Sequence, residues 1–177
     1  YIAYRKSFSP FSLKTGVRVE QTIWDSKLLT TGQSNHRDFI DYFPSAHLTY
    51  KTGKASVFSL GYSRRISRPS VRMLNPFLKF IDAITIRTGN PLLSPEYTHS
   101  FELSHVLSWK KTTLNSSLYF RNTSNTIQKI SYIDSSGNAV TTYGNFRFDK
   151  DLGVEVYFTA QLNKWYRLHN QLQFFRI

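Results

Sequence analysis

Apolar and polar residues alternate with a period of two over much of this chain. In residues 151–162 every second side chain is apolar, from Leu152 to Leu162, and the residues between them are Gly153, Glu155, Tyr157, Thr159 and Gln161. Residues 11–23, 58–62, 101–107 and 114–120 show weaker forms of the same alternation. Because successive side chains of a strand point to opposite faces of a sheet, the pattern predicts strands with one apolar and one polar face.

The amino-acid composition also favours strands over helices. The chain has 14 Phe, 11 Tyr and 3 Trp against one Met, and aromatic residues are enriched in strands. Its longest uninterrupted apolar stretch, residues 1–4, is far shorter than the ~20 residues that a membrane helix needs. With 40% hydrophobic residues the 177-residue chain is not disordered by composition, and its aromatic content predicts an all-β protein.

Two all-β architectures produce this alternation, and the periodicity alone does not choose between them. In a soluble β-sandwich the apolar faces pack together, whereas in a membrane β-barrel the apolar face contacts lipid and the polar face lines the lumen. The order of the connections favours the barrel, because bacterial barrels have short turns on one side and long loops on the other. Short connections are predicted at residues 7–10, 52–54, 110–111 and 163–164, and long ones at 25–41 and 67–97, with a hairpin tip at 134–138.

Aromatic residues flank the predicted short connections. Phe8 and Phe11 border the first, Trp109 precedes the third, and Trp165 and Tyr166 follow the last. An aromatic belt at a membrane interface would place rings at these positions. The alternative is that the rings cover the end of a soluble core.

Positive charge is concentrated around the start of the long connection at 67–97. Four arginines lie within nine positions: Arg64, Arg65, Arg68 and Arg72. Arg64 and Arg65 must face opposite sides of a strand. Because a guanidinium group binds carboxylates and phosphates well, Arg64, Arg68 and Arg72 are candidates to bind anionic substrate groups or lipopolysaccharide phosphates. The alternative is internal pairing with Asp82, Glu96 or carboxylates in the lumen.

Turn-forming residues dominate the end of the same connection. Pro91 and Pro95 fix φ and lack an amide donor, and Gly89 permits a turn. Asn90 is held out of the helical region by the proline that follows it. Glu96 is expected to be a structural brace that accepts hydrogen bonds from loop amides, rather than a direct ligand contact.

No catalytic or metal site is predicted. The chain has no cysteine, its five histidines lack metal-ligand spacing, and no Gly-rich phosphate loop precedes a helix. The aromatic residues fall mainly on the apolar face instead of interleaving with basic residues, which argues against nucleic-acid binding by stacking. We therefore expect a protein that is not an enzyme, with no cofactor and no nucleic-acid partner.

Several phrases of the sequence resemble the outer-membrane β-barrel of TonB-dependent receptors, in the form common in Bacteroidetes. They are GYSRRISRPS (61–70), LNPF (74–77) and RTGNPLLSPEYTHSFEL (87–103), with TGVRVEQT (15–22) before them and SLYFRNTSNTI (117–127) and GVEVYF (153–158) after them. Together they cover roughly residues 11 to 177. The motif residues expected to have a structural role are Arg65, Pro69, Asn75, Pro76, Gly89, Asn90, Pro91, Pro95 and Glu96.

The resemblance implies an antiparallel, up-and-down transmembrane β-barrel in the bacterial outer membrane. Residues 1–177 would supply about eight strands of a barrel that has roughly 22 in such receptors. They would belong to one barrel domain, with the plug domain and the remaining strands absent.

The resemblance further implies a receptor that binds a nutrient outside the cell and imports it with energy from the TonB complex, delivered through the missing plug. The nutrient would be a ferric siderophore, a vitamin, a glycan or a peptide. Outer-membrane lipid and lipopolysaccharide are expected partners, and a surface lipoprotein is a further candidate. The alternatives are a soluble β-sandwich that binds glycans or polyanions, and a complete small eight-stranded outer-membrane barrel.

Overall fold

The computed structural model describes residues 1–27, 32 and 34–176, which are almost entirely strands. The elements in the described residues are β1 (Ile2–Phe8), β2 (Phe11–Lys27), β3 (Ser34–Thr52), β4 (Ser56–Ser67), α1 (Val71–Leu74), β5 (Lys79–Phe80), β6 (Thr85–Arg87), β7 (Glu96–Trp109), β8 (Thr112–Ile133), β9 (Ala139–Gln161) and β10 (Arg167–Arg176). Within these residues no helix is long and apolar enough to cross a bilayer.

The strands form one sheet in which chain order largely sets the neighbours. The order is β1-β2-β3-β4-β7-β8-β9, with both β10 and the short β6–β5 pair attached to β9. The predicted all-β, up-and-down fold of about eight strands is confirmed by the eight longer strands. In the described part of the chain β1 pairs only with β2 and β10 only with β9, so the sheet does not close on itself.

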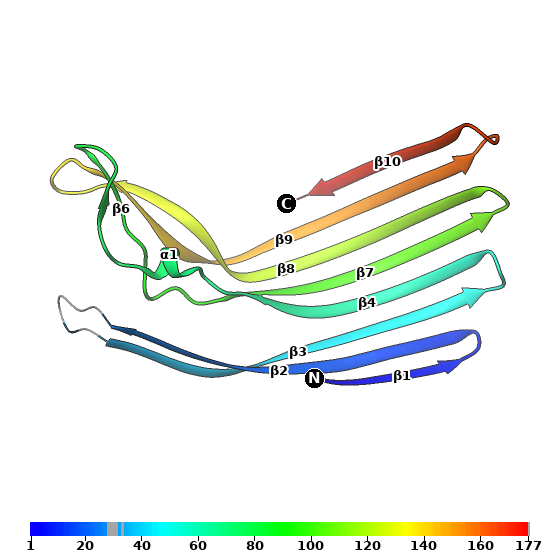
Figure 1. Cartoon of the computed structure of the whole chain (residues 1–177), viewed down its shortest axis with the longest axis horizontal. Coiled ribbons are helices and arrows are strands. Elements are labelled where there is room, and N and C mark those ends of the chain that lie inside the picture. Colours follow the sequence, from blue (N-terminus) through cyan, green and yellow to red (C-terminus); the bar gives the residue numbers. More distant parts are fainter. Residues whose placement is uncertain (28–31, 33, 177) are drawn as a thin grey trace. The chain divides into compact units, whose positions relative to one another are not determined.

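The chain divides into two compact units, each made of segments from several strands. The first unit contains residues 1–63, 101–117 and 156–172, and the second contains residues 64–100, 118–155 and 173–176. All four short turns belong to the first unit and lie at the same end of its strands (Figure 1). The long connection between β4 and β7, which we call the excursion (residues 68–95), belongs to the second unit.

One predicted long connection is mostly strand. The sequence predicted a loop over 25–41, but β2 continues to Lys27 and β3 begins at Ser34, in a ladder that runs from Phe11↔Tyr50 to Lys27↔Ser34. In the ladder the backbone N–H and C=O groups of the two strands bond to each other. A segment with polar side chains can therefore still form paired strands. Residues 28–31 and 33 of that predicted loop lie outside the described residues.

The apolar face of the first unit has no second layer over it. Cross-strand pairs carry this face from strand to strand, as in Leu13↔Leu48 and Leu48↔Leu60. Leu60 on β4, Leu103 on β7 and Leu172 on β10 remain 52%, 48% and 58% exposed. Because a sandwich would bury these side chains in its core, the soluble β-sandwich interpretation is wrong. The apolar face suits contact with lipid.

Aromatic rings gather at the short-turn end of the first unit. Phe11 lies 5.8 Å from Phe8 and 4.8 Å from Tyr50, measured between ring centroids. Trp165 and Tyr166 lie 6.0 Å apart in the turn between β9 and β10. All five rings are exposed to solvent. This arrangement is what an interfacial belt requires at the end of membrane-spanning strands.

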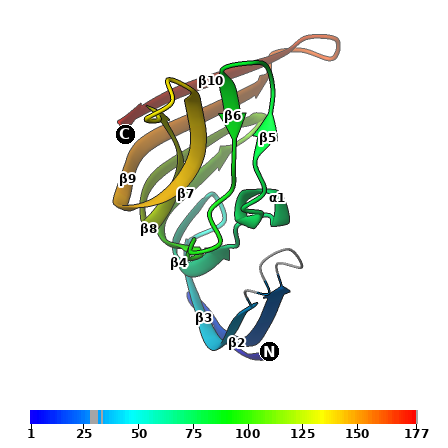
Figure 2. The same cartoon turned by 90° about the vertical axis from the view of Figure 1, so that its left-hand side faces the viewer.

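The second unit contains the excursion and the hairpin of β8 and β9. Within the excursion, β5 and β6 form a small antiparallel hairpin next to α1 (Figure 2), which the sequence did not predict. The predicted tip at 134–138 is present. There the carboxylate of Asp134 accepts hydrogen bonds from the N–H groups of Ser136 (2.9 Å) and Asn138 (2.8 Å), and Gly137 has a positive φ of 82°.

Candidate functional site

Two legs of the excursion are joined at Gly89. Its N–H donates to the carbonyl of Asn75 (2.8 Å), and the N–H of Asn90 donates to the carbonyl of Met73 (2.7 Å). A Cβ on residue 89 would lie 2.5 Å from both acceptor oxygens, closer than real side chains approach backbone. Only glycine permits this join, which ties the end of α1 to the segment that follows β6.

The returning leg of the excursion is also fixed to β9. The parallel ladder pairs Ile86 with Val140, and both side chains are buried with 6% exposure. The N–H of Thr88 donates to the carbonyl of Thr141 (3.0 Å). The side chain of Asn90 donates to the carbonyl of Tyr143 (3.0 Å). The excursion is therefore held against β9 by both an apolar pair and backbone hydrogen bonds.

Glu96 contacts the backbone of β8. Its Oε1 accepts a hydrogen bond of 2.6 Å from the N–H of Ile127, two residues after Asn125, which has a positive φ of 57°. Asn145 on β9 donates to the carbonyls of Asn125 (2.7 Å) and Ser94 (2.9 Å) and accepts from the N–H of Ser94 (2.8 Å). Glu96 and Asn145 thus connect the end of the excursion to β8 and β9 at an irregular point of β8.

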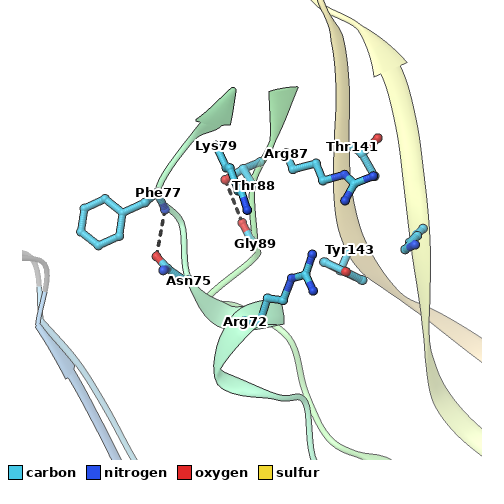
Figure 3. A pocket seen from close by; sticks show the side chains of 10 residues that line it. Arg72, Asn75, Phe77, Lys79, Arg87, Thr88, Gly89, Thr141 and Tyr143 are labelled. Atoms are coloured by element: carbon cyan, nitrogen blue, oxygen red, sulfur yellow. Dashed lines mark hydrogen bonds between the residues drawn. The ribbon is translucent and has the colours of Figure 1, made fainter. Parts of the chain in front are cut away.

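A basic pocket lies between the excursion and the β8–β9 hairpin. Its volume is about 190 Å³, against the ~10–15 Å³ that one water requires. In Figure 3 the side chains of Arg72 and Arg87 extend toward Thr141 and Tyr143. The lining residues are Arg72, Asn75, Phe77, Lys79, Arg87, Thr88, Gly89, Lys129, Thr141 and Tyr143.

The pocket is electrostatically one-sided. Arg72, Lys79, Arg87 and Lys129 line it, and no Asp or Glu does. Within the part of the chain that the structure describes, none of these four cations forms an ion pair. All four are exposed to solvent. Solvent-exposed cations without a carboxylate can attract an anion, and salt weakens that attraction.

The acidic residues that lie nearest in the sequence to Arg72, Lys79 and Arg87 accept hydrogen bonds from backbone amides. Segment 64–100 has six basic and two acidic residues, and the acids are Asp82 and Glu96. The carboxylate of Asp82 accepts a hydrogen bond from the N–H of Ile84 (3.0 Å). This hydrogen bond, with further ones from Thr85, lowers the pKa of Asp82. Both carboxylates therefore have acceptor roles within the excursion and β8.

The structure separates the three arginines that the sequence marked as ligand candidates. Arg72, on α1, lines the pocket. The guanidinium of Arg64, on β4, lies over the ring of Tyr97 at 4.6 Å from the centroid. Arg68 lies after the end of β4 and outside the lining. Ligand binding by Arg64 and Arg68 remains a prediction.

The other motif residues lie in β4, around α1 and between β6 and β7. The carbonyl of Pro76 accepts a hydrogen bond from the Thr88 hydroxyl (3.0 Å), and the N–H of Asn75 donates to the carbonyl of Val71 at the end of α1. Arg65 lies in β4, Pro69 precedes α1, and Pro91 and Pro95 lie between β6 and β7.

Sequence reasoning missed Lys79, Arg87, Lys129 and Asn145. Lys79 and Arg87 meet through the pairing of β5 with β6, and Lys129 is distant from both in the sequence and reaches the pocket only through the pairing of β8, β9 and β6. Asn145 offered a signal, because asparagine is disfavoured inside a strand. No group of three or more His, Cys, Asp or Glu side chains that could hold a metal ion occurs among the described residues.

Comparison with known proteins defines the family. A model described as the outer membrane protein beta-barrel family matches residues 1–177. This chain belongs to that family. It is therefore a β-barrel chain of the bacterial outer membrane, and its uncovered apolar face agrees with this location. A search of curated proteins found no match.

Solved structures confirm that this family member has a receptor-type barrel fold. The ferric enterobactin receptor PfeA of Pseudomonas aeruginosa, in complex with enterobactin, matches with a TM-score of 0.72 and 16% identity over 97% of this chain. The siderophore receptor PirA of the same organism matches with a TM-score of 0.68 and 14% identity over 94% of this chain. The hemophore receptor HasR of Serratia marcescens matches with a TM-score of 0.68 and 14% identity over 85%.

The matched region is only part of each receptor. This chain spans 25% of PfeA, 34% of PirA and 29% of HasR. The similarity therefore establishes the barrel fold of the family member, and the expected resemblance to receptor barrels is confirmed at that level.

Proposed function

We propose that this chain is part of the wall and part of the outer surface of a nutrient receptor that imports its ligand across the outer membrane. The observation that supports this proposal most strongly is the fold match to PfeA, whose solved structure holds enterobactin, over 97% of this chain. The uncovered apolar face would contact lipid, and the excursion would contribute to the ligand-binding surface.

We also propose that the chain is one part of a larger barrel. β1 and β10 do not pair with each other in the described residues, so more strands would be needed for closure. A plug inside the completed barrel would couple import to the TonB complex. Lipid, lipopolysaccharide and a surface lipoprotein are the other proposed partners, and no catalytic role is assigned.

Uptake measurements test the import function. A strain in which the gene is deleted should lose uptake of one compound from a panel containing a ferric siderophore, cobalamin, an oligosaccharide and a peptide. Because import is proposed to depend on energy, a protonophore should abolish the same uptake in the parent strain. Unchanged uptake of every compound in the deletion strain would remove import as the function.

The length of the barrel has its own test. The gene product purified in detergent should be much heavier than the 20.6 kDa of this chain when measured by mass spectrometry. A gene product of this mass that spans the membrane as a monomer would instead support the alternative of a small, complete barrel.

A further inference from the structure

We propose that the basic pocket of the excursion is a binding site for a phosphate-type oxyanion, with Arg72 and Arg87 as its principal ligands. The pocket contains four cations, two of them arginines, and no acidic side chain. Arginine presents a planar fork of donors that suits phosphate oxygens. In Figure 3 the two guanidinium groups extend from α1 and β6 into the same space, beside Thr141 and Tyr143.

The pairing of β5 with β6 is a second, independent indication of a ligand. Lys79 and Arg87 are direct cross-strand partners in a ladder of only two residue pairs. Like charges directly opposite each other destabilise a sheet. An oxyanion between these side chains would offset the repulsion, so this local cost is explained if an anion binds there.

The cations lie on parts of the chain that are already fixed. Arg87 follows the buried Ile86, which pairs with Val140 of β9. Arg72 lies in α1, whose end is joined to Gly89 and Asn90 by backbone hydrogen bonds. Because the backbone that carries these side chains is held by hydrogen bonds without a ligand, binding needs to order side chains only.

Two sources can supply such a group outside the outer membrane. One is a soluble ligand with phosphate or a similar oxyanion, and the other is the phosphorylated headgroup of lipopolysaccharide. Treating the anion as part of an imported nutrient rests on the function proposed above, whereas anion binding by the pocket does not.

The experiment uses the protein as its gene encodes it, purified in detergent and freed of lipopolysaccharide. Binding of inorganic pyrophosphate is measured by isothermal titration calorimetry at low ionic strength. Arg72→Gln and Arg87→Gln should each weaken binding roughly tenfold, the effect expected for loss of one charged hydrogen bond. The same binding should weaken as salt is raised.

Arg147→Gln is the matched control. Arg147 lies on β9 in the same unit, over the ring of Phe148 at 5.7 Å, and does not line the pocket. The Arg147→Gln substitution removes the same charge from the chain and should leave pyrophosphate binding unchanged. Absence of pyrophosphate binding by the parent protein, or an equal loss in Arg147→Gln, would overturn the proposal. Because all three arginines are exposed, we expect the variants to fold, and heat-dependent gel mobility checks this.

Competition distinguishes the two sources. Purified lipopolysaccharide that displaces pyrophosphate, when its dephosphorylated form does not, assigns the site to the lipid. Failure of both forms to displace it assigns the site to a soluble ligand. Binding is measured without cells or an energy source, so it does not depend on import. Pyrophosphate binding without nutrient uptake would support the pocket proposal and reject the nutrient-receptor proposal. Uptake without pyrophosphate binding would support the receptor and reject the pocket.

Discussion

Lys79 of β5 and Arg87 of β6 lie directly opposite each other, although like charges in that position oppose strand pairing. We predict that Lys79→Gln stabilises the β5–β6 hairpin of the unliganded protein. Hydrogen exchange of the amides in residues 79–87 should become slower. Lys54→Gln, in the turn between β3 and β4, removes the same charge elsewhere and should leave the exchange of residues 79–87 unchanged. Faster exchange in Lys79→Gln would show that Lys79 supports the hairpin instead.

Gly89→Ala should open the join between the two legs of the excursion. The added methyl group would lie 2.5 Å from the carbonyl oxygens of Met73 and Asn75, which are backbone atoms. We expect a local loss of roughly 1–3 kcal/mol, seen as faster proteolysis within residues 68–95. Gly61→Ala is the control, because its Cβ would meet its nearest neighbour, a His47 ring nitrogen, at an ordinary 3.6 Å. Equal proteolysis of both variants would contradict the role of Gly89.

Glu96→Ala should expose the amide of Ile127 to exchange. The substitution removes the acceptor of a 2.6 Å hydrogen bond and leaves a part-buried N–H without it, at an expected cost of ~1–3 kcal/mol. Glu96→Gln keeps an oxygen acceptor and should retain most of the protection. Glu102→Ala, at an exposed position of β7, serves as the control. Full protection of the Ile127 amide in Glu96→Ala would mean that the hydrogen bond from Ile127 to Glu96 does not stabilise this part of β8.

The tip of the β8–β9 hairpin should loosen in acid. The hydrogen bond from the backbone N–H of Asn138, followed by that from its side chain, lowers the pKa of Asp134 below its ordinary 3.8. The closed tip therefore binds a proton less readily than the open tip. The ionised carboxylate of Asp134 therefore stabilises the closed tip. This stabilisation is complete above the ordinary pKa of 3.8 and is lost as the pH falls through the lowered pKa of Asp134. The protection factor of the Asn138 amide, which corrects exchange for its intrinsic pH dependence, should fall over that range, and Asp134→Ala should remove this change in protection.

Leu60→Arg should hinder insertion into a bilayer much more than it alters the chain in water. Leu60 lies on the uncovered apolar face of β4, where the side chain is 52% exposed. An arginine facing lipid costs roughly 2–4 kcal/mol at the bilayer midplane. Ser59→Arg places the same charge on the opposite face of the strand and should be tolerated. Refolding into lipid vesicles, followed by heat-dependent gel mobility, compares them. Equal yields would argue against lipid contact by Leu60.

The barrel wall could be predicted from the sequence because a period of two leaves a repeated signal. The alternation from Leu152 to Ala160 falls in β9, and the turn at Lys110 and Lys111 joins β7 to β8. The prediction failed where pairing overrides composition. Residues 25–27 and 34–41 have polar, loop-like sequence but continue the β2–β3 ladder. β5 and β6 were missed because two and three residues are too few to show a period.

The pocket could be predicted only in part. Arg72 was marked because it stands in an arginine-rich segment, but Lys129 has no such context and reaches the pocket through β8. Likewise, the sequence indicated a turn at Gly89 without showing which carbonyls it meets. A turn or a cluster of charge can be predicted from neighbouring residues. The contact between α1, β6 and β9 cannot, because it depends on strand order.

The attachment of β6 to the first residues of β9 has a consequence for folding. The N–H of Thr88 and the side chain of Asn90 bond to Thr141 and Tyr143, about fifty residues further along the chain. These contacts close a much longer loop than the short turns that join the strands of the wall, so the hairpins of the wall can form before the excursion docks. A chain that lacks β9 would keep β4, β7 and β8 but would lose Thr141 and Tyr143 from the pocket.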